Sequence, residues 1–205
     1  NYLDQSLSLK LNWAHEHSNE TYTGLDDADF NQNPFQRYSS TERDQMNWDH
    51  RQYFLSYALS PSDDTRVRVT TYHHNFQRAW NKLNGFAGTN PNNPSPSIRT
   101  VFNDPDSSQY NYYYKVLSGQ ADSGVLDDDR DVLDIGNNQR QFISQGIQTN
   151  IQYELDGYEA AHLFKFFYRL HNDKIDRYHQ SSYWDMKNGT LVADSSRSIK
   201  DTAVN

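Results

Sequence analysis

The chain has 205 residues and a formal net charge of −8; only 35% of its residues are hydrophobic, yet 14% are aromatic. Its mean hydropathy is −1.02 and its pI is about 5.4. Aromatic enrichment with few aliphatic residues is unusual for a packed α/β enzyme; it suits strands with one narrow apolar face and one wet face. The negative charge disfavours a nucleic-acid partner, and the lack of cysteine excludes disulfides, thiol nucleophiles and thiolate metal sites.

The sequence contains no run of about 18 apolar residues, so it predicts no membrane-spanning helix. Membrane-crossing β-strands would leave no such run, because they are short and alternate in polarity. The fifteen tyrosines lie partly in alternating runs, which argues against disorder of the whole chain. The sequence lacks an initiator methionine and enters a strand-like pattern almost at once, so we expect an internal part of a longer protein.

The first predicted element is a strand over residues 6–17, where apolar and polar residues alternate with period two. Two further strands, over 46–60 and 65–83, are separated by turn residues at 61–64 and form a predicted antiparallel hairpin. The last two predicted strands cover 140–155 and 158–178.

A second tight turn is predicted between these last two strands. Asp156-Gly157 is the strongest short hairpin signal in the sequence, so we expect a two-residue turn at 156–157.

The alternation gives every predicted strand an apolar face and a polar face. The apolar set, expected to face lipid if these strands form a barrel wall, is Leu7, Leu9, Leu11, Tyr53, Leu55, Tyr57, Val67, Val69, Ile147 and Ile151. The polar set, expected to face the lumen, is Lys10, Asn12, Arg66, Arg68, Gln148 and Asn150.

The connections are of two kinds, tight turns at one end of the strands and long polar loops over 18–45 and 84–139 at the other. This asymmetry is typical of outer-membrane barrels. The pattern predicts a single partial β-barrel segment over 1–205, with about five to six strands. Within the second loop, 107–117 fits either a short helix or a strand.

Three stretches resemble TonB-dependent outer-membrane siderophore receptors, in particular those similar to the ferric dicitrate receptor. The first stretch is Glu20-Thr21-Tyr22, Gly24-Leu25, Asp29-Phe30, Asn33-Pro34, Arg37-Tyr38, Asp44, Met46 and Trp48. The second is Tyr72, Asn75-Phe76 and Arg78 to Asn84, and the third is Phe142, Ser144-Gln145-Gly146 and Gln148-Thr149.

The resemblance implies an all-β fold, a portion of a 22-stranded transmembrane β-barrel closed by an N-terminal plug. On this resemblance we expect no plug domain within residues 1–205. It implies a receptor in the outer membrane of a Gram-negative bacterium that binds and imports a ferric chelate, either a siderophore or iron dicitrate. Energy would come through TonB, which we expect to contact only parts of the receptor outside these 205 residues. Outer-membrane lipid is the other expected partner.

Arg37 and Arg43 are the candidate ligand-binding residues, since planar guanidinium groups match the carboxylates of a ferric chelate. The alternative for Arg37 is structural, with the side chain pinning the loop through Asp29 or Glu42.

Gly24, Pro34 and Trp80 are candidate loop-shaping residues, through an unusual backbone angle, a turn and an aromatic girdle respectively. A role in shaping a binding loop and a purely structural role both remain open for them.

Two further clusters carry weaker signals. His15 and His17 share a strand face as a metal pair would, but no third ligand is evident, and His73 and His74 point to opposite faces. The acidic run 127–131 lacks the spacing of an EF-hand, which favours a solvated loop. We therefore expect no metal site.

No phosphate-binding loop, nucleophile elbow or HExxH motif occurs in the sequence, so we expect neither an enzyme, nor a catalytic residue, nor a cofactor. The rival interpretation is a soluble all-β binding module, a sandwich that recognises a glycan or a protein through its loops.

Overall fold

The computed structural model describes residues 4–197 and 200–204. These residues form one antiparallel sheet in which β1 to β6 follow in sequence order and β7 pairs with β5. The strands are β1 (Asp4–Ser18), β2 (Gln45–Ser62), β3 (Thr65–Phe86), β4 (Leu133–Asp156), β5 (Ala161–Lys187), β6 (Thr190–Ala193) and β7 (Lys200–Val204). The prediction of an all-β, antiparallel fold is confirmed, and the open sheet is compatible with a piece of a barrel.

All five predicted strands are present, but β4 and β5 extend further than predicted at the long-loop end. β4 begins at Leu133 rather than near 140, and β5 continues to Lys187 rather than ending near 178. Next to the predicted strand ends, residues 136–139 and 179–182 are all polar or glycine, so the alternation that marks a strand in the sequence is interrupted there. The backbone hydrogen bonds between β4 and β5 nevertheless continue through both extensions. The second long connection is therefore 87–132, shorter than the predicted 84–139.

The two tight turns differ from each other. A turn between β2 and β3 is present, but β2 continues to Ser62, past an irregularity in its pairing after Leu59, so only Asp63 and Asp64 of the predicted turn 61–64 join the two strands. The predicted two-residue turn at 156–157 is wrong: residues 157–160 form the turn, and the Gly157 N–H donates to the Ala160 carbonyl at 3.0 Å.

Side-chain pairing across β4 and β5 explains the longer turn. A two-residue turn would place Ala160 opposite Tyr153 and His162 opposite Ile151. The observed register instead places Phe164 and Phe166 there. Aromatic and β-branched pairs stabilise antiparallel strands more than these alternatives, so packing sets the register.

The two predicted faces exist as continuous rows across the sheet. Leu9, Leu55, Thr71, Ile147 and Leu170 are consecutive cross-strand partners and therefore lie on one side. All ten predicted apolar residues are on this side, called here the apolar face, and all six predicted polar residues are on the other, called the inner face.

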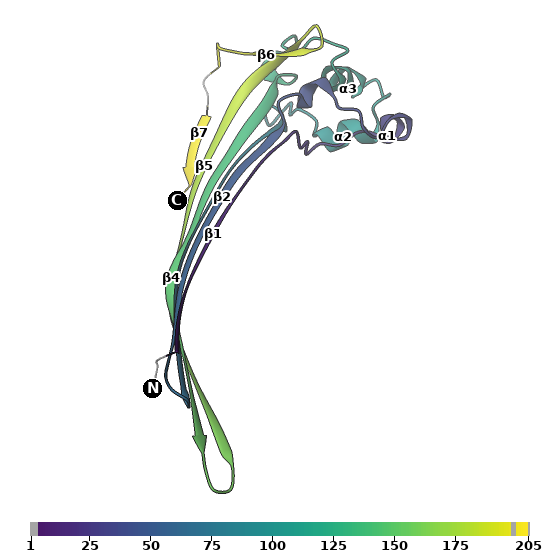
Figure 1. Ribbon diagram of the computed structural model, residues 1–205. Helices are drawn as coiled ribbons and strands as arrows, with labels where there is room; N and C mark the ends of the chain where they lie inside the picture. The colour runs from purple at the N-terminus through teal and green to yellow at the C-terminus, as the bar shows by residue number, and fades with distance from the viewer. Residues whose placement is uncertain (1–3, 198–199, 205) are drawn as a thin grey trace.

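The sheet is bowed, and the two long connections fold together over its concave side (Figure 1). They form α1 (Asp27–Gln32), α2 (Ile98–Asn103) and α3 (Asn111–Ser118), with short 3-10 turns η1 (Ser39–Thr41) and η2 (Asp127–Asp129). We call residues 19–44 and 87–132 the cap. The helical alternative for 107–117 is the one observed. Among the described residues, no helix has the length and apolar character needed to cross a bilayer.

The hydrophobic core lies between the cap and the adjoining strand ends rather than along the sheet. α2 and α3 contribute one side, while β3, β4, β5 and β6 contribute the other. Its buried members are Leu83, Val101, Tyr113, Val116, Leu117, Leu133, Ile135, Met186 and Leu191. The rows of the apolar face are left uncovered: Leu7 is 71% exposed and Phe166 60% exposed.

Candidate functional site: the basic inner face beneath the cap

The cap is held together by a network of carboxylates and tyrosine hydroxyls. Asp26 caps the N-terminus of α1 by accepting from the Asp29 N–H at 2.9 Å. The Asp29 carboxylate in turn accepts from the hydroxyls of Tyr38, at 2.7 Å, and Tyr114, at 2.6 Å. The bond from Tyr114 lowers the pKa of Asp29, and burial raises the pKa of both tyrosines. Because Tyr114 belongs to the second connection, this network joins the two loops.

Asp44 fastens the first connection to the sheet. This side chain is 1% exposed. One of its oxygens accepts from the Leu83 N–H at 2.7 Å, and the other accepts from the Thr21 hydroxyl at 3.1 Å. Burial raises the pKa of Asp44 despite these donors. The position of the cap over the sheet thus depends on a buried carboxylate at the base of the loop.

Arg37 is fully engaged in closing the first connection. Its guanidinium donates to the backbone carbonyls of Asn19 at 3.1 Å, Asp44 at 2.7 Å and Thr41 at 2.8 Å. These contacts are structural, as in the alternative interpretation, but the acceptors are backbone carbonyls rather than the expected carboxylates.

Arg43 has a different environment. Its exposed guanidinium lies 4.2 Å from the ring centroid of Trp184, beside a pocket that Glu42, Gln45 and Asn81 also line. The structure does not bring Arg37 and Arg43 together into one anion site.

The three loop-shaping candidates lie in or against the first connection. Gly24 has a φ of 70°, in the left-handed region that favours glycine. Pro34 follows Asn33, the C-cap residue of α1. Trp80 projects from the inner face, and its ring meets that of Tyr22 edge-on at 5.6 Å.

Three arginines lie side by side on the inner face, close to the cap. Arg78 on β3 is the cross-strand partner of Arg140 on β4, and Arg140 is the partner of Arg177 on β5. We call Arg78, Arg140 and Arg177 the arginine row. None of the three forms an ion pair with a carboxylate in the part of the chain that the structure describes. Like charges directly opposite one another on a sheet are unfavourable, so the row favours an anion beside it.

At least one N–H donor of the arginine row lacks an acceptor among the described residues. The Arg140 Nε donates to the Asn138 side chain at 3.2 Å. The Nε of Arg78 is buried and has no hydrogen-bond partner among residues 4–197 and 200–204. A buried donor without a partner is costly, and an anion bound between the guanidinium groups would relieve that cost.

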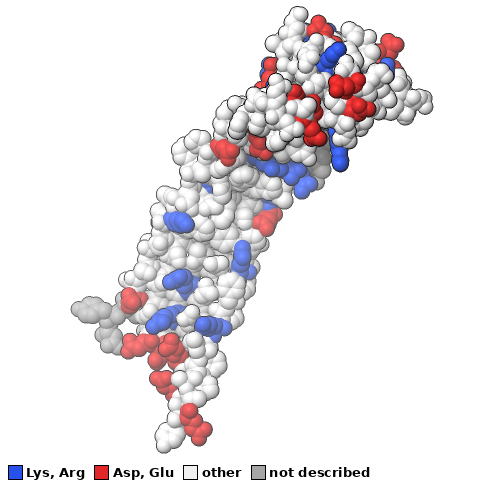
Figure 2. Space-filling model, turned by 90° about the vertical axis from the view of Figure 1, so that its right-hand side faces the viewer, with Lys and Arg blue, Asp and Glu red and all other residues white. Residues whose placement is uncertain are grey.

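The basic character continues along the inner face towards the tight turns. Figure 2 shows Lys and Arg along this side of the sheet, while Asp and Glu gather mainly in the cap and near the turns. The cations that the pairing places on this face are Lys10, Arg66, Arg68, Arg78, Lys82, Arg140, Lys165, Arg169 and Arg177. A chain with net charge −8 thus has one predominantly cationic face.

About halfway along the inner face, a cluster of polar side chains from β3 and β5 lies beside Gly146. Tyr72 crosses Gly146, and its hydroxyl hydrogen-bonds to the His171 Nδ1 at 2.5 Å and accepts from the Arg169 Nε at 3.0 Å. The other nitrogen of His171 lies 2.9 Å from the Asp173 carboxylate. This cluster fixes the positions of Arg169 and His171 across three strands.

The remaining sequence candidates are two histidine pairs and an acidic run. His15 and His17 share a face, as expected, while His73 and His74 are on opposite faces. Within the described ranges, no group of three or more potential ligands is placed to hold a metal ion. The acidic run 127–131 is only partly solvated, because Asp131 is fully buried and accepts from Tyr112 at 2.6 Å.

Comparison with known proteins identifies no similar protein. No protein-family model, no curated protein and no solved structure matches the chain significantly.

Proposed function

We propose that this chain is part of the wall of a TonB-dependent receptor that binds and imports a ferric chelate across a bacterial outer membrane. The observation that carries the proposal is the contrast between the two faces of one sheet. One face exposes rows of leucine, isoleucine and aromatic residues, and the other carries lysines and arginines. In a barrel wall the first face contacts lipid and the second lines a wet lumen.

The lengths of the strands support this proposal. β1 to β5 contain 15 to 27 residues each, whereas a tilted strand crosses a bilayer in about 9–11 residues. The excess lies at the cap end, which in this proposal is the outer side of the membrane.

The rival soluble sandwich would bury the apolar face against a second sheet. Among the described residues no second sheet covers it, and Leu9 remains 64% exposed. Apolar patches of this extent are not left in water, so a lipid environment accounts for the face better than a sandwich does.

The arginine row suggests how the ligand is held. Ferric chelates of hydroxycarboxylates are anionic, and the net charge of −8 repels them at long range. Local cations must therefore supply the attraction. The adjacent planar guanidinium groups of the row form no ion pair with a carboxylate among the described residues, and they match several carboxylates of one chelate.

The cap then serves as an outer cover, and the cations further down the inner face offer successive positions for the anion. Arg37 acts in this proposal by holding the cap rather than by touching the chelate. Arg43 remains a candidate for ligand contact because its guanidinium is exposed.

The test uses the protein that carries this chain, purified from membranes in detergent, with ferric dicitrate as the probe. Arg140→Gln should weaken equilibrium binding by roughly tenfold to a hundredfold, the value of one charge-assisted contact. The matched control is Lys115→Gln, which removes a positive charge from an exposed position on α3 and should leave binding unchanged. Equal affinity in wild type and Arg140→Gln would contradict this assignment of the ligand site.

A further inference from the structure

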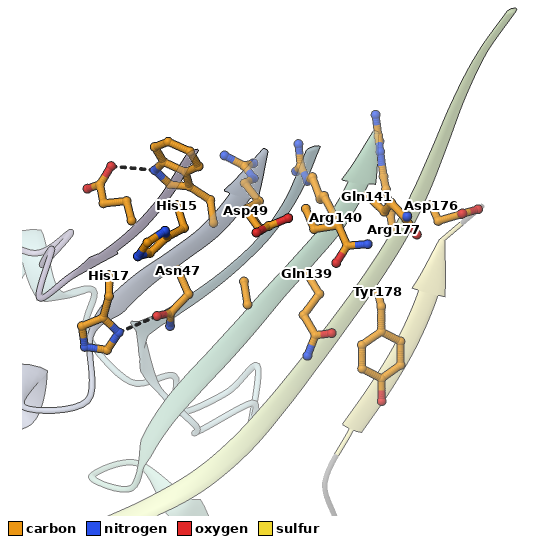
Figure 3. Close-up of a pocket in the computed structure, with 15 residues that line it drawn as sticks. His15, His17, Asn47, Asp49, Gln139, Arg140, Gln141, Asp176, Arg177 and Tyr178 are labelled. Carbon is orange, nitrogen blue, oxygen red and sulfur yellow. Dashed lines mark hydrogen bonds between the residues drawn. The ribbon is translucent and has the colours of Figure 1, made fainter. Parts of the chain in front are cut away.

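The inner face carries cations at two levels. The upper level is the arginine row beneath the cap, where Arg140 and Arg177 project to one side of the sheet and Gln139 and Tyr178 project to the other (Figure 3). The lower level lies near the tight turns, where Figure 2 shows further Lys and Arg next to the acidic residues of the turn end. The proposed function uses the upper level and leaves the lower one unexplained.

Arg66 and Arg68 on β3 are the centre of the lower level. Arg68 precedes Arg78 by ten positions on the same strand (78 minus 68), which is about 33 Å at about 3.3 Å per residue. Among the described residues, neither side chain forms an ion pair or a hydrogen bond. Both are exposed, whereas Arg78 is half-buried. The two lower guanidinium groups are therefore available to an anion from solvent.

A hollow of about 470 Å³ lies beside these two arginines on the inner face. One side of it has small side chains, since Ser6 on β1 pairs with Ala58 on β2 and Ala58 pairs with Arg68. On the other side, Asn150 and Gln152 on β4 are the cross-strand partners of the two arginines. Their amides line the hollow and add hydrogen-bond donors beside the guanidinium groups.

The charges around the hollow favour an anion that stays there. Lys165 on β5 is the cross-strand partner of Gln152 and adds a third cation on the next strand. Asp4 is the one carboxylate among the described residues that line the hollow, and β2 lies between it and the arginines. Beyond the hollow, Asp63 and Asp64 form the turn and repel an anion.

We propose that this hollow is a second binding site for the anionic ferric hydroxycarboxylate, occupied after the chelate leaves the arginine row. The guanidinium groups of Arg66 and Arg68 bind its carboxylates, and the amides of Asn150 and Gln152 donate to its remaining oxygens. This inference rests on the proposed function, because it takes the same ligand along the same wet face.

The exposure of the two levels gives them different strengths. Water weakens the attraction between an exposed guanidinium and a carboxylate more than it weakens that of a half-buried one, so the hollow binds the chelate less tightly than the arginine row does. A pathway needs such sites, strong enough to receive the ligand and weak enough to release it. The hollow therefore suits the exit side of the wall.

The experiment places one nitroxide label beside each level in the protein that carries this chain, purified in detergent. His50→Cys puts the label one row from Arg78, and Ser56→Cys puts it one row from Arg68. The 205 residues contain no other cysteine. The probe is ferric dicitrate, whose paramagnetic iron speeds the relaxation of a nearby nitroxide. Gallium dicitrate carries a diamagnetic ion on the same ligand and controls for a change of conformation.

We expect ferric dicitrate to speed relaxation at both labels, with half-saturation at position 56 requiring about tenfold more chelate than at position 50. Arg66→Gln/Arg68→Gln should abolish the effect at position 56 and leave that at position 50 unchanged. Gallium dicitrate should change neither label.

A second variant separates the hollow from its charges. Ala58→Trp fills the hollow and keeps both arginines, and it should also abolish the effect at position 56. The matched charge control is Arg99→Gln/Lys115→Gln in the cap, which removes two exposed cations and should leave both labels responding as in the wild type.

The outcomes distinguish this inference from the proposed function. No effect of ferric dicitrate at position 56, an equal effect of gallium dicitrate there, or an unchanged effect in Arg66→Gln/Arg68→Gln overturns the second site, even where position 50 reports binding at the arginine row. A response at position 56 alone would keep the hollow and contradict the arginine row as the ligand site. No response at either label would contradict the proposed chelate ligand and this inference with it.

Discussion

The carboxylate of Asp44 accepts a 2.7 Å hydrogen bond from the backbone N–H of Leu83, which lies 39 residues further along the chain. Both residues are almost fully buried. This one bond connects the end of the first cap loop to β3 at the edge of the hydrophobic core.

Replacing Asp44 tests how much the cap depends on that bond. Asp44→Ala leaves the buried Leu83 N–H without a partner and should destabilise the cap by about 1–3 kcal/mol. Asp44→Asn keeps the acceptor for Leu83 and should cost much less. Hydrogen–deuterium exchange of the Leu83 amide reports the difference, and equal protection in both variants would contradict the role given to this bond.

The raised pKa of Asp44 predicts that the stability of the cap depends on pH. Burial raises the pKa of Asp44 above its ordinary value of 3.8, so the folded cap binds a proton more readily than the open cap does. The associated stability is fully present below the ordinary pKa and is lost as pH rises through the raised value. Exchange rates in the cap, corrected for intrinsic pH dependence, should show this loss in the wild type but not in Asp44→Asn. A matching pH profile in the two proteins would refute it.

Arg37 should act on the cap rather than on the ligand directly. Arg37→Gln removes charge-assisted bonds to backbone carbonyls, each worth about 1.5–3 kcal/mol, and should raise proteolytic cleavage within residues 19–44. Arg37→Lys should restore little, since one ammonium cannot reproduce the planar arrangement of donors. If Arg37→Gln leaves the cap resistant to protease yet abolishes chelate binding, the ligand-contact interpretation is the correct one.

Gly146 leaves room for the Tyr72 side chain to lie across β4 on the inner face and to reach His171 on β5. A Cβ at this position would lie 2.3 Å from the Leu170 carbonyl and 2.6 Å from the Tyr72 hydroxyl. Gly146→Ala should therefore destabilise the sheet by about 1–3 kcal/mol and displace Tyr72 from His171. Urea unfolding measures the loss, with Gln148→Ala on the same strand face as the control. Wild-type stability in Gly146→Ala would show that the sheet relaxes there without cost.

The sheet could be predicted from the sequence because alternation is a local signal. Leu7, Leu9 and Leu11 mark a strand and its apolar face without reference to any other part of the chain. The turn after Asp156 was predicted wrongly for the opposite reason, since the pairing of Phe164 with Tyr153 involves two strands and decides the register.

The arginine row and the fold of the cap depend on contacts that no local pattern reveals. Arg78, Arg140 and Arg177 lie far apart in the sequence and become neighbours only through the registers of two strand pairs. Their one sequence signal is that Arg78 shares its strand face with Arg66 and Arg68. Similarly, Asp29 and Tyr114 belong to different loops, and neither loop predicts the other's position.

The most direct test of the central claim is an accessibility scan along residues 53–58 of β2, where alternate residues belong to opposite faces. The chain has no cysteine, so single cysteines from Tyr53→Cys to Ala58→Cys each carry one nitroxide label, in protein reconstituted into lipid vesicles. We expect collision with lipid-soluble oxygen to be highest at 53, 55 and 57, and collision with a water-soluble nickel chelate to be highest at 54, 56 and 58. Nickel accessibility that is equal at all six positions, or highest at 53, 55 and 57, would contradict a wall with lipid on one face and a wet lumen on the other.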